Sequence, residues 1–343
     1  GKEPGDAAAI AREIVDRSRR VLLTRASGAH AAAVATAVDA RATGGSDRFM
    51  PVGPDIVEAQ VRALAKDLGP LADLRSRQGL QVVVSTASPR DTLRALPSAP
   101  AYVLLVGDIG QIPIGSDSDP EYSTLLGGDS YPELFVGRFS AENPDHVATQ
   151  VQRTLTYERD LAAASDFMQY GMGVASNQGP GDDNEYDDDH ENVIRQKLLN
   201  YGYLGVDQIY DPYGTAAQVT AGLNAGRGTI NYTGHGSQTS WGSTGFSNTH
   251  VNALVNWNML PFICSVACVN GDFVGTSECF AESWLRQSGG GAVSFEGAST
   301  NESWVPWITR NGGASRRMWS TGDTAWNSSG LFRYEPRITS RST

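Results

Sequence analysis

From about residue 55 onward, the hydrophobic positions of this chain alternate between two patterns. Short runs of consecutive apolar residues are typical of buried strands in parallel sheets, and apolar residues that recur every three or four positions are typical of one helix face. The pattern predicts strands at 80–84, 101–106, 134–139, 172–176, 208–210, 229–236, 261–268 and 292–296. It predicts helices at 56–68, 71–78, 143–160, 190–201, 216–225, 249–255 and 279–287. The first two helices are expected to be separated by a stop or kink at Gly69-Pro70, because proline removes a helix hydrogen bond.

This alternation predicts an α/β fold with mostly parallel sheets flanked by helices, in two subdomains. Residues 1–54 are rich in Ala and Arg, with helical character from Ala7 to Leu23, and are interpreted as an N-terminal segment or the remnant of a pro-region. The two subdomains are expected at 55–163 and 164–305, and the pattern leaves the structure of the C-terminal tail at 306–343 undetermined.

Two of the predicted strands end in a reactive side chain. The run 229–236 ends in Gly234-His235-Gly236, and the run 261–268 ends in Ala267-Cys268. In open parallel sheets, ligands and catalytic groups gather beyond the carboxyl ends of the strands. The interval between His235 and Cys268 has the length that a crossover between neighbouring parallel strands requires. We interpret the two residues as a Cys–His dyad for nucleophilic catalysis.

The chemistry of this dyad is well defined. A thiol attacks as its thiolate, and a nearby imidazole can take the thiol proton and later protonate a leaving amine. Cys264 is the rival nucleophile, since a strand places it on the same face as Cys268, but only Cys268 reaches the strand end. Cys264 is interpreted as a small buried residue and Cys279 as packing at a helix start. Flanking glycines, which allow close substrate approach, are absent from the other four histidines, His30, His146, His190 and His250.

Composition narrows the class of protein further. The formal net charge of −11 makes nucleic acid an unsuitable partner and a cationic substrate a suitable one. No run approaches the roughly 18 apolar residues of a membrane span. The chain begins at Gly1 without a visible signal peptide, so a processed or trimmed form is expected.

The cysteines indicate neither disulfides nor a metal. Three cysteines confined to positions 264–279 do not form a disulfide framework. A zinc site that combined Cys264 and Cys268 with His235 or His250 would lack a convincing fourth ligand. We therefore assign no metal-ligating residue and no required cofactor.

Longer motifs surround the two candidate groups. One is Asn231-Tyr232-Thr233-Gly234-His235-Gly236-Ser237, and the other is Val266-Ala267-Cys268-Val269-Asn270-Gly271-Asp272-Phe273, with Cys279-Phe280-Ala281-Glu282 behind it. Both resemble the gingipains, and specifically the arginine-specific ones, within the caspase-like clan of cysteine peptidases. Weaker matches extend this resemblance over residues 68–305, at 77–80, 102–108, 135–139, 299–300 and 303–304.

The resemblance implies a caspase-like fold and a secreted or cell-surface cysteine endopeptidase, made as a zymogen, that cleaves protein or peptide substrates after Arg at P1. Such an enzyme could remove its own N-terminal segment after Arg41 or Arg48. Two alternatives stay open. The same dyad could serve a Lys or mixed basic preference, or the chain could be a catalytically inactive gingipain-like binding module.

The resemblance also implies roles for individual residues. The peptide N–H groups of Gly236 and Cys268 are the expected oxyanion donors. Asp187 is expected at the base of the S1 pocket, with Asp188 and Asp189 as register alternatives, because a carboxylate pairs bidentately with guanidinium.

Three further positions carry weaker expectations. Trp304 would stack on the guanidinium as a pocket wall, or is a plain packing aromatic. Gln178 stands where the family has a carboxylate that orients the histidine, and Gln238 replaces a glutamate of the substrate-binding region. These neutral amides stabilise imidazolium less than carboxylates do.

The acidic run 182–189 has two other interpretations besides the S1 pocket. It is either a solvated loop or a structural Ca²⁺ site, although it lacks the EF-hand spacing.

Overall fold

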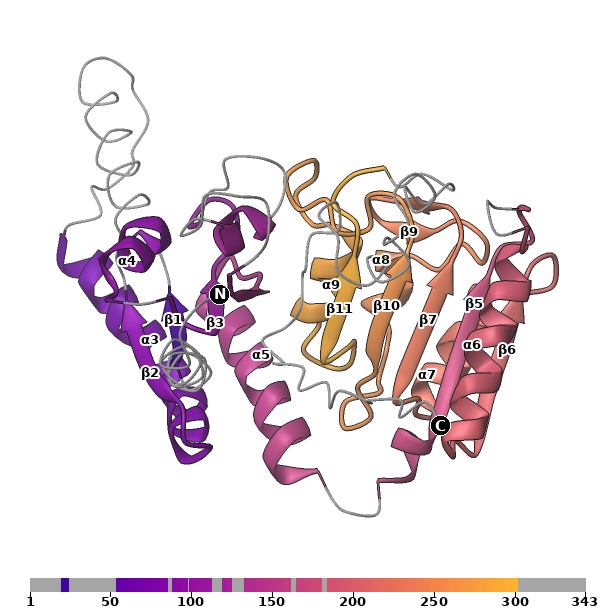
Figure 1. The fold of residues 1–343 in the computed structure, drawn as a ribbon, viewed down its shortest axis with the longest axis horizontal. Coiled ribbons are helices and arrows are strands. Elements are labelled where there is room, and N and C mark those ends of the chain that lie inside the picture. The colour runs from indigo at the N-terminus through magenta and orange to yellow at the C-terminus, as the bar shows by residue number, and fades with distance from the viewer. Residues whose placement is uncertain are drawn as a thin grey trace, which may run out of the picture.

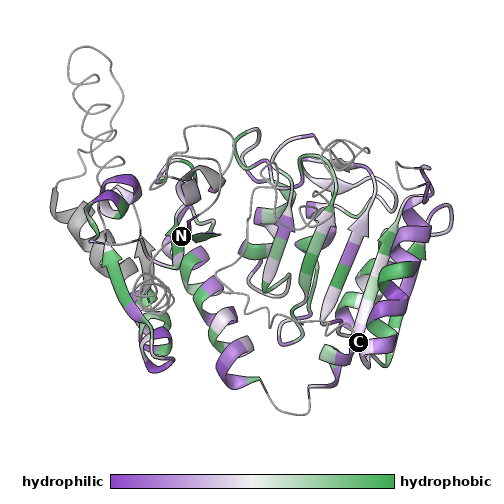
Figure 2. Cartoon of the chain, viewed as in Figure 1, coloured by the Kyte–Doolittle hydropathy of each residue, from purple (hydrophilic) through white to green (hydrophobic). Residues whose placement is uncertain are grey.

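The computed structural model describes residues 20–24, 54–85, 88–97, 99–112, 119–124, 133–161, 165–180 and 184–301. Two parallel sheets lie side by side in these residues, and helix α5 (Pro144–Leu155) runs between them (Figure 1). Figure 2 shows hydrophobic stretches along the strands of both sheets and alternating hydrophobic and hydrophilic bands on the helices. The predicted α/β arrangement of mostly parallel sheets flanked by helices is confirmed. The predicted boundaries of the four parts of the chain stay predictions.

The first sheet has four parallel strands in the order β2-β1-β3-β4. Their bounds are β1 Arg20–Thr24, β2 Gln81–Ser85, β3 Tyr102–Val106 and β4 Phe135–Phe139. The accompanying helices are α3 Pro54–Arg77, α4 Pro89–Ala95, η1 Asp119–Thr124 and α5, which continues into the π-helical turn η2 Thr156–Asp160.

Strand β1 corrects one sequence prediction. Residues 20–23 were expected to end a helix, yet Arg20–Thr24 pairs in parallel with β2 on one side and β3 on the other. A short apolar run such as Val21-Leu22-Leu23 suits a central strand, and periodicity alone does not separate such a strand from a buried helical segment.

Helix α3 corrects a second prediction, because it runs unbroken from Pro54 to Arg77 with Pro70 inside it. Leu68 and Leu71 flank the proline and are 3% and 1% exposed in the core of the first subdomain. Burial of these side chains stabilises the helix on both sides of the proline, where local propensity alone would end it.

The second sheet has five parallel strands in the order β11-β10-β7-β5-β6. Their bounds are β5 Tyr170–Ala175, β6 Gly205–Tyr210, β7 Thr229–Thr233, β10 Phe262–Val266 and β11 Ser294–Gly297. A short antiparallel hairpin, β8 Gly236–Ser237 with β9 Ser240–Trp241, follows β7. The helices are η3 Asp166–Gln169, α6 Asp187–Tyr201, α7 Ala216–Asn224, α8 Asn248–Val251 and α9 Phe280–Arg286.

Two helix boundaries in this unit differ from the prediction by three residues or more. Helix α6 begins at Asp187 and not at His190, because three aspartates in the first turn face the positive end of the helix dipole. Helix α8 ends at Val251, four residues before the predicted end at Val255.

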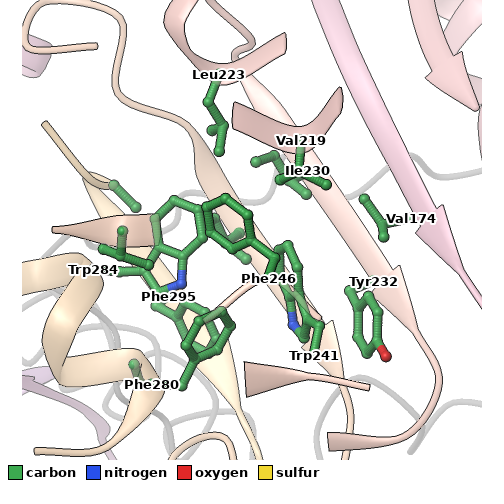
Figure 3. Close-up of a cluster of buried hydrophobic side chains, with 14 of the residues drawn as sticks. Val174, Val219, Leu223, Ile230, Tyr232, Trp241, Phe246, Phe280, Trp284 and Phe295 are labelled. Carbon is green, nitrogen blue, oxygen red and sulfur yellow. The ribbon is translucent and has the colours of Figure 1, made fainter. Parts of the chain in front are cut away.

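An aromatic cluster forms the core beneath the second sheet (Figure 3). Tyr232 of β7 stacks on Trp241 of β9 with ring centroids 4.7 Å apart. Trp241 also meets Phe280 and Trp284 of α9 at 5.3 and 5.9 Å. Because Trp241 follows the predicted histidine loop, this packing fixes the hairpin against the body of the subdomain.

Arg153 of α5 joins the two sheets. Its side chain is buried, and its guanidinium donates hydrogen bonds to the carbonyl oxygens of Trp284 at 2.7 Å, Ala292 at 2.8 Å and Gly290 at 2.6 Å, and to that of Gln287. Burial lowers the pKa of Arg153 to about 9. Among the described residues, this arginine therefore binds backbone of the second subdomain and has no carboxylate partner.

A second connection runs from α9 back to the first subdomain. Arg286 pairs with Glu282 on its own helix at 2.7 Å and with Asp108, beyond β3, at 3.0 Å. Ser140, after β4, donates a hydrogen bond to the same Glu282 carboxylate at 2.5 Å.

Replacing Arg153 by methionine is expected to lower the free energy of unfolding by about 3 kcal/mol, because several buried carbonyl groups would lose their donor. Urea unfolding measures this change. Arg159→Met is the matched control, since Arg159 is an exposed residue of η2 that pairs with its neighbour Asp160. Equal urea midpoints for the two variants would contradict the role assigned to Arg153.

Candidate active site

The two predicted reactive side chains follow neighbouring strands at equal distances. Strands β7 and β10 pair in register, with Thr233 opposite Val266 at their carboxyl ends. His235 and Cys268 each lie two residues beyond these partners. The N–H of Gly234 donates to the carbonyl of Val266 at 3.2 Å, so the two chains are still joined as they leave the sheet.

Gly236 shows how closely the two loops approach. A Cβ atom placed on this glycine would lie 2.5 Å from the carbonyl oxygen of Cys268 and 2.8 Å from the Cβ of Ala267. Any larger residue after His235 would therefore push the cysteine loop away. His235 is exposed and Cys268 is half-buried, so both are accessible to a substrate.

Backbone hydrogen bonds hold His235 in place. Its carbonyl oxygen accepts a hydrogen bond from the Tyr232 hydroxyl at 2.6 Å and another from the N–H of Gly242 at 2.7 Å. Gly234, just before it, has a φ of +157°, and a Cβ there would lie 2.9 Å from the Tyr232 hydroxyl oxygen. The glycine lets the chain turn over the tyrosine and bring the histidine to the edge of the sheet.

The turn after Cys268 is strained. Val269 has a φ of +50°, in the left-handed region that a β-branched residue rarely adopts. Its N–H donates to the carbonyl of Thr300 at 3.0 Å, and its own carbonyl accepts from the N–H of Asp272 at 3.2 Å. Such strain persists only where the surroundings enforce it, and it gathers at functional sites. The sequence gives no sign of it, since valine is the residue least expected there.

Asp187, the first residue of α6, lies at the same edge of the sheet, beside the end of a third strand, β5. Its carboxylate accepts a hydrogen bond from the hydroxyl of Ser176, which follows β5, and its side chain is buried. Burial raises the pKa of Asp187, while the Ser176 hydrogen bond and the charges of His235 and His190 act in the opposite direction. The carboxyl group therefore lies within electrostatic reach of His235.

Gln178 and Gln238 make different contacts. Gln178 is exposed, and its backbone carbonyl accepts from the N–H of Asp187 at 3.0 Å. Its predicted role in orienting His235 stays a prediction, and Asp187 is a second candidate for that role. Gln238 donates through Nε2 to a carboxylate oxygen of Asp272 at 2.8 Å, which links the histidine loop to the cysteine loop.

The remaining predicted residues fall into two groups. Cys264 lies in the middle of β10 and is half-buried, so the expectation of a buried residue is wrong, whereas Cys279 is buried at the start of α9 as predicted. Trp304, Asp182 and Asp183 lie outside the described residues.

Two functional candidates were missed in the sequence. Glu191 lies one turn after Asp187 on α6, is 1% exposed, and accepts a hydrogen bond from the Thr233 hydroxyl at 2.8 Å. Burial raises its pKa to about 8, with the Thr233 hydrogen bond opposing and the Asp187 charge adding to the effect. Asn270, two residues after Cys268, is fully buried. Their spacing from Asp187 and Cys268 was the available signal.

Neither a metal-binding cluster nor a membrane-spanning helix occurs in the part of the chain that the structure describes. In these residues, no group of three or more His, Cys, Asp or Glu side chains is arranged to hold a metal ion. None of the helices there combines the length and hydrophobicity that a membrane crossing requires. A Ca²⁺ site in the acidic loop stays a prediction.

Fold and site together define an α/β protein of the caspase-like kind, with a histidine and a cysteine at the carboxyl edge of a parallel sheet. The family model described as Peptidase family C25 matches residues 56–329. The chain belongs to this family.

The chain is also similar in sequence to individual gingipains. The chain is 44% identical to Gingipain R2 of Porphyromonas gingivalis over 214 residues, which cover 60% of this chain and 29% of the relative. It is 29% identical to Lys-gingipain HG66 of the same organism over 223 residues, or 61% of this chain and 12% of the relative. The chain thus spans less than a third of the length of the curated gingipains it matches.

Solved structures show the same fold. The crystal structure of the Arg specific cysteine proteinase gingipain R (RGPB) superposes with a TM-score of 0.65 and 30% identity, covering 85% of this chain and 65% of that one. The complex of Porphyromonas gingivalis RgpB pro- and mature domains gives a TM-score of 0.66 at 35% identity, over 71% of this chain and 63% of the other. The resemblance to arginine-specific gingipains and the caspase-like fold predicted from it are confirmed.

Glu191 makes a pH-dependent contribution to stability. Its folded-state pKa of about 8 is above the value of roughly 4.3 in an unfolded chain, so the folded state keeps the proton longer. The resulting stability is present below about pH 4 and is lost as the pH rises through 8. Glu191→Gln, which is neutral at every pH, should therefore show a smaller fall in melting temperature between pH 5 and pH 8 than the wild type.

Asp189→Asn is the control for this measurement, because Asp189 is an exposed carboxylate in the first turn of the same helix. It should keep the wild-type dependence of melting temperature on pH. A Glu191→Gln protein with that same dependence would show that Glu191 does not retain its proton.

Proposed function

We propose that this protein is a cysteine endopeptidase that cleaves peptide bonds after arginine, with Cys268 as nucleophile and His235 as its acid–base partner. The in-register ending of β7 and β10 is the observation that supports this most strongly, because it brings both residues to one edge of the sheet. The caspase-like fold, membership of peptidase family C25 and the similarity to proteins named gingipain R support the same chemistry.

In the proposed reaction, His235 takes the thiol proton and the Cys268 sulfur attacks the scissile carbonyl carbon. The carbonyl oxygen becomes an oxyanion, which the peptide N–H groups of Gly236 and Cys268 would stabilise. The C–N bond breaks as imidazolium returns the proton to the leaving amine, which leaves a thioester on Cys268. Water, deprotonated by His235, then hydrolyses the thioester and restores the thiol.

Asp187 supports the preference for arginine. It is a buried carboxylate beside the candidate dyad, so a cationic P1 side chain entering there would meet an acceptor with little competition from water. Guanidinium matches the two carboxylate oxygens better than ammonium does. The stronger similarity to gingipain R2 than to Lys-gingipain HG66 favours Arg over a Lys or mixed basic preference.

The setting of the enzyme is also part of the proposal. We infer a secreted or cell-surface peptidase made as a zymogen, acting on protein or peptide substrates and needing no cofactor, with Ca²⁺ at most as a structural ion. The relation to a solved complex of pro- and mature domains supports the zymogen. The inactive binding module is the competing function, and the neutral Gln178 and Gln238 are the residues that favour it.

Matched fluorogenic peptides with Arg, Lys, Ala or Asp at P1 test the activity directly. Under reducing conditions, the Arg peptide should be cleaved with a kcat/KM at least tenfold above that for Lys. Cys268→Ala and His235→Ala should lose this activity, whereas Cys264→Ala, which removes the rival thiol, should keep it. Folded wild-type protein that cleaves none of the peptides would favour the binding module.

Asp187→Asn separates a pocket role from an orienting role. The measurement compares kcat/KM for peptides with Arg or citrulline at P1, since citrulline has the shape of arginine without its charge. A pocket carboxylate predicts a loss of about 10²-fold for Arg and little change for citrulline. An orienting carboxylate predicts equal losses for both peptides. Asp189→Asn, on the exposed side of the same turn, should change neither value by more than about twofold.

A further inference from the structure

Asn270 is a buried amide between the two loops of the candidate site. It is fully buried, two residues beyond Cys268, in the turn that contains the strained Val269. Its side-chain nitrogen donates to the carbonyl oxygens of Ser237 at 2.7 Å and Ser240 at 3.1 Å. These two residues face each other across the β8–β9 hairpin, which begins directly after His235.

The other end of the amide is anchored in the sheet. Its Oδ1 accepts a hydrogen bond from the hydroxyl of Ser265 at 2.8 Å, and the Ser265 oxygen in turn accepts from the indole N–H of Trp241 at 2.9 Å. The backbone carbonyl of Asn270 accepts from the N–H of Ala281 at 2.9 Å. Both side-chain donor hydrogens and the acceptor are thus used, which a group that merely filled space would not require.

The contacts of Asn270 lie beside both members of the dyad. A Cβ on Gly236 would be 2.9 Å from the Asn270 side-chain nitrogen, so the amide touches the residue that follows His235. On its other side, the amide is one residue from Val269, whose left-handed backbone is held by its own hydrogen bonds to Thr300 and Asp272. Asn270 therefore holds the histidine hairpin and the cysteine turn against each other.

We propose that Asn270 is a positioning residue that sets the placement of His235 relative to Cys268 by tying the β8–β9 hairpin to the turn after the nucleophile. This inference rests on the dyad proposed above. Asn270 touches neither substrate nor the reacting atoms in this role, and acts only through the two loops it joins.

The amide chemistry makes the role specific. Alanine would leave the carbonyls of Ser237 and Ser240 and the hydroxyl of Ser265 without their partner in a buried place. An ionised aspartate has the same shape but only acceptor atoms, so it would face the two carbonyl oxygens without a hydrogen to offer. Both variants should loosen the hairpin, and a displacement of about 1 Å costs on the order of 10²-fold in rate.

The experiment measures kcat and KM for an Arg-P1 peptide in wild type, Asn270→Ala and Asn270→Asp, with the folded fraction checked by circular dichroism. Asn256→Ala is the matched control. Asn256 is also fully buried and also donates to two carbonyl oxygens, those of Met259 and Gly291, but it precedes β10 at the opposite end of that strand. Asn270 variants should lower kcat by about 10²-fold or more with less than a threefold change in KM. Asn256→Ala should lower the melting temperature yet keep kcat within threefold.

A second readout does not depend on proteolysis. The rate of iodoacetamide alkylation at Cys268, located by peptide mass analysis, is followed from pH 5 to pH 9 in wild type, His235→Ala, Asn270→Ala and Asn256→Ala. Asn270→Ala should shift the rate profile towards that of His235→Ala, whereas Asn256→Ala should follow the wild type.

The outcomes separate the two proposals. If the wild type cleaves Arg peptides and the Asn270 variants keep kcat within threefold, or lose no more than Asn256→Ala, the positioning role is overturned and the function stands. If the wild type cleaves nothing but its alkylation depends on His235 and Asn270, the positioning role stands and the peptidase function falls. If Cys268 is alkylated with the same pH profile in wild type and in His235→Ala, both proposals are overturned.

Discussion

The parallel pairing of β7 with β10 is the constraint on which the rest of the site depends. A parallel ladder makes neighbouring strands end together, so two loops that begin at paired residues start from the same height above the sheet. The hydrogen bond from Gly234 to Val266 carries that alignment beyond the last ladder pair. The hairpin and the left-handed turn at Val269 then adjust the separation of His235 and Cys268, which the strand pairing already brings to neighbouring positions.

Buried polar groups also form hydrogen bonds where these loops leave the sheet. Asp187 and Glu191 come from α6 and Asn270 from the cysteine loop, and each has a hydrogen bond to a residue in or just beyond a neighbouring strand. Burying such groups is unfavourable unless they are paired. The pairing is complete at the Asn270 amide, whereas the second carboxyl oxygen of Glu191 is buried without a hydrogen-bond partner among the described residues. The second sheet therefore combines an aromatic core with a polar layer at its carboxyl edge, where the chemistry is proposed.

Much of the fold and the two residues of the proposed dyad could be predicted from the sequence, and the predictions that failed have physical causes. The placement of His235 and Cys268 just beyond two strand ends was predictable, because a buried apolar run followed by glycine or a turn has few other interpretations. Strand β1 was not, since its apolar residues gain strand character only from pairing with β2 and β3, which are distant in sequence. Pro70 inside α3 shows the same dependence on tertiary packing. Asn270 and Glu191 were missed because a polar residue reveals its burial only once the partners are known.

The anchoring of α5 has a consequence for how the molecule responds to acid. Burial raises the pKa of Glu282, the partner of Arg286, to about 7, so the folded state binds this proton at a higher pH than the unfolded chain does. Arg153 instead holds neutral carbonyl groups, which do not titrate. As the pH falls through 7, protonation of Glu282 should therefore favour the folded state, and the arginine–carbonyl contacts should be retained. The joint between the subdomains thus combines a carboxyl group that mild acid helps to bury with carbonyl contacts that acid leaves unchanged.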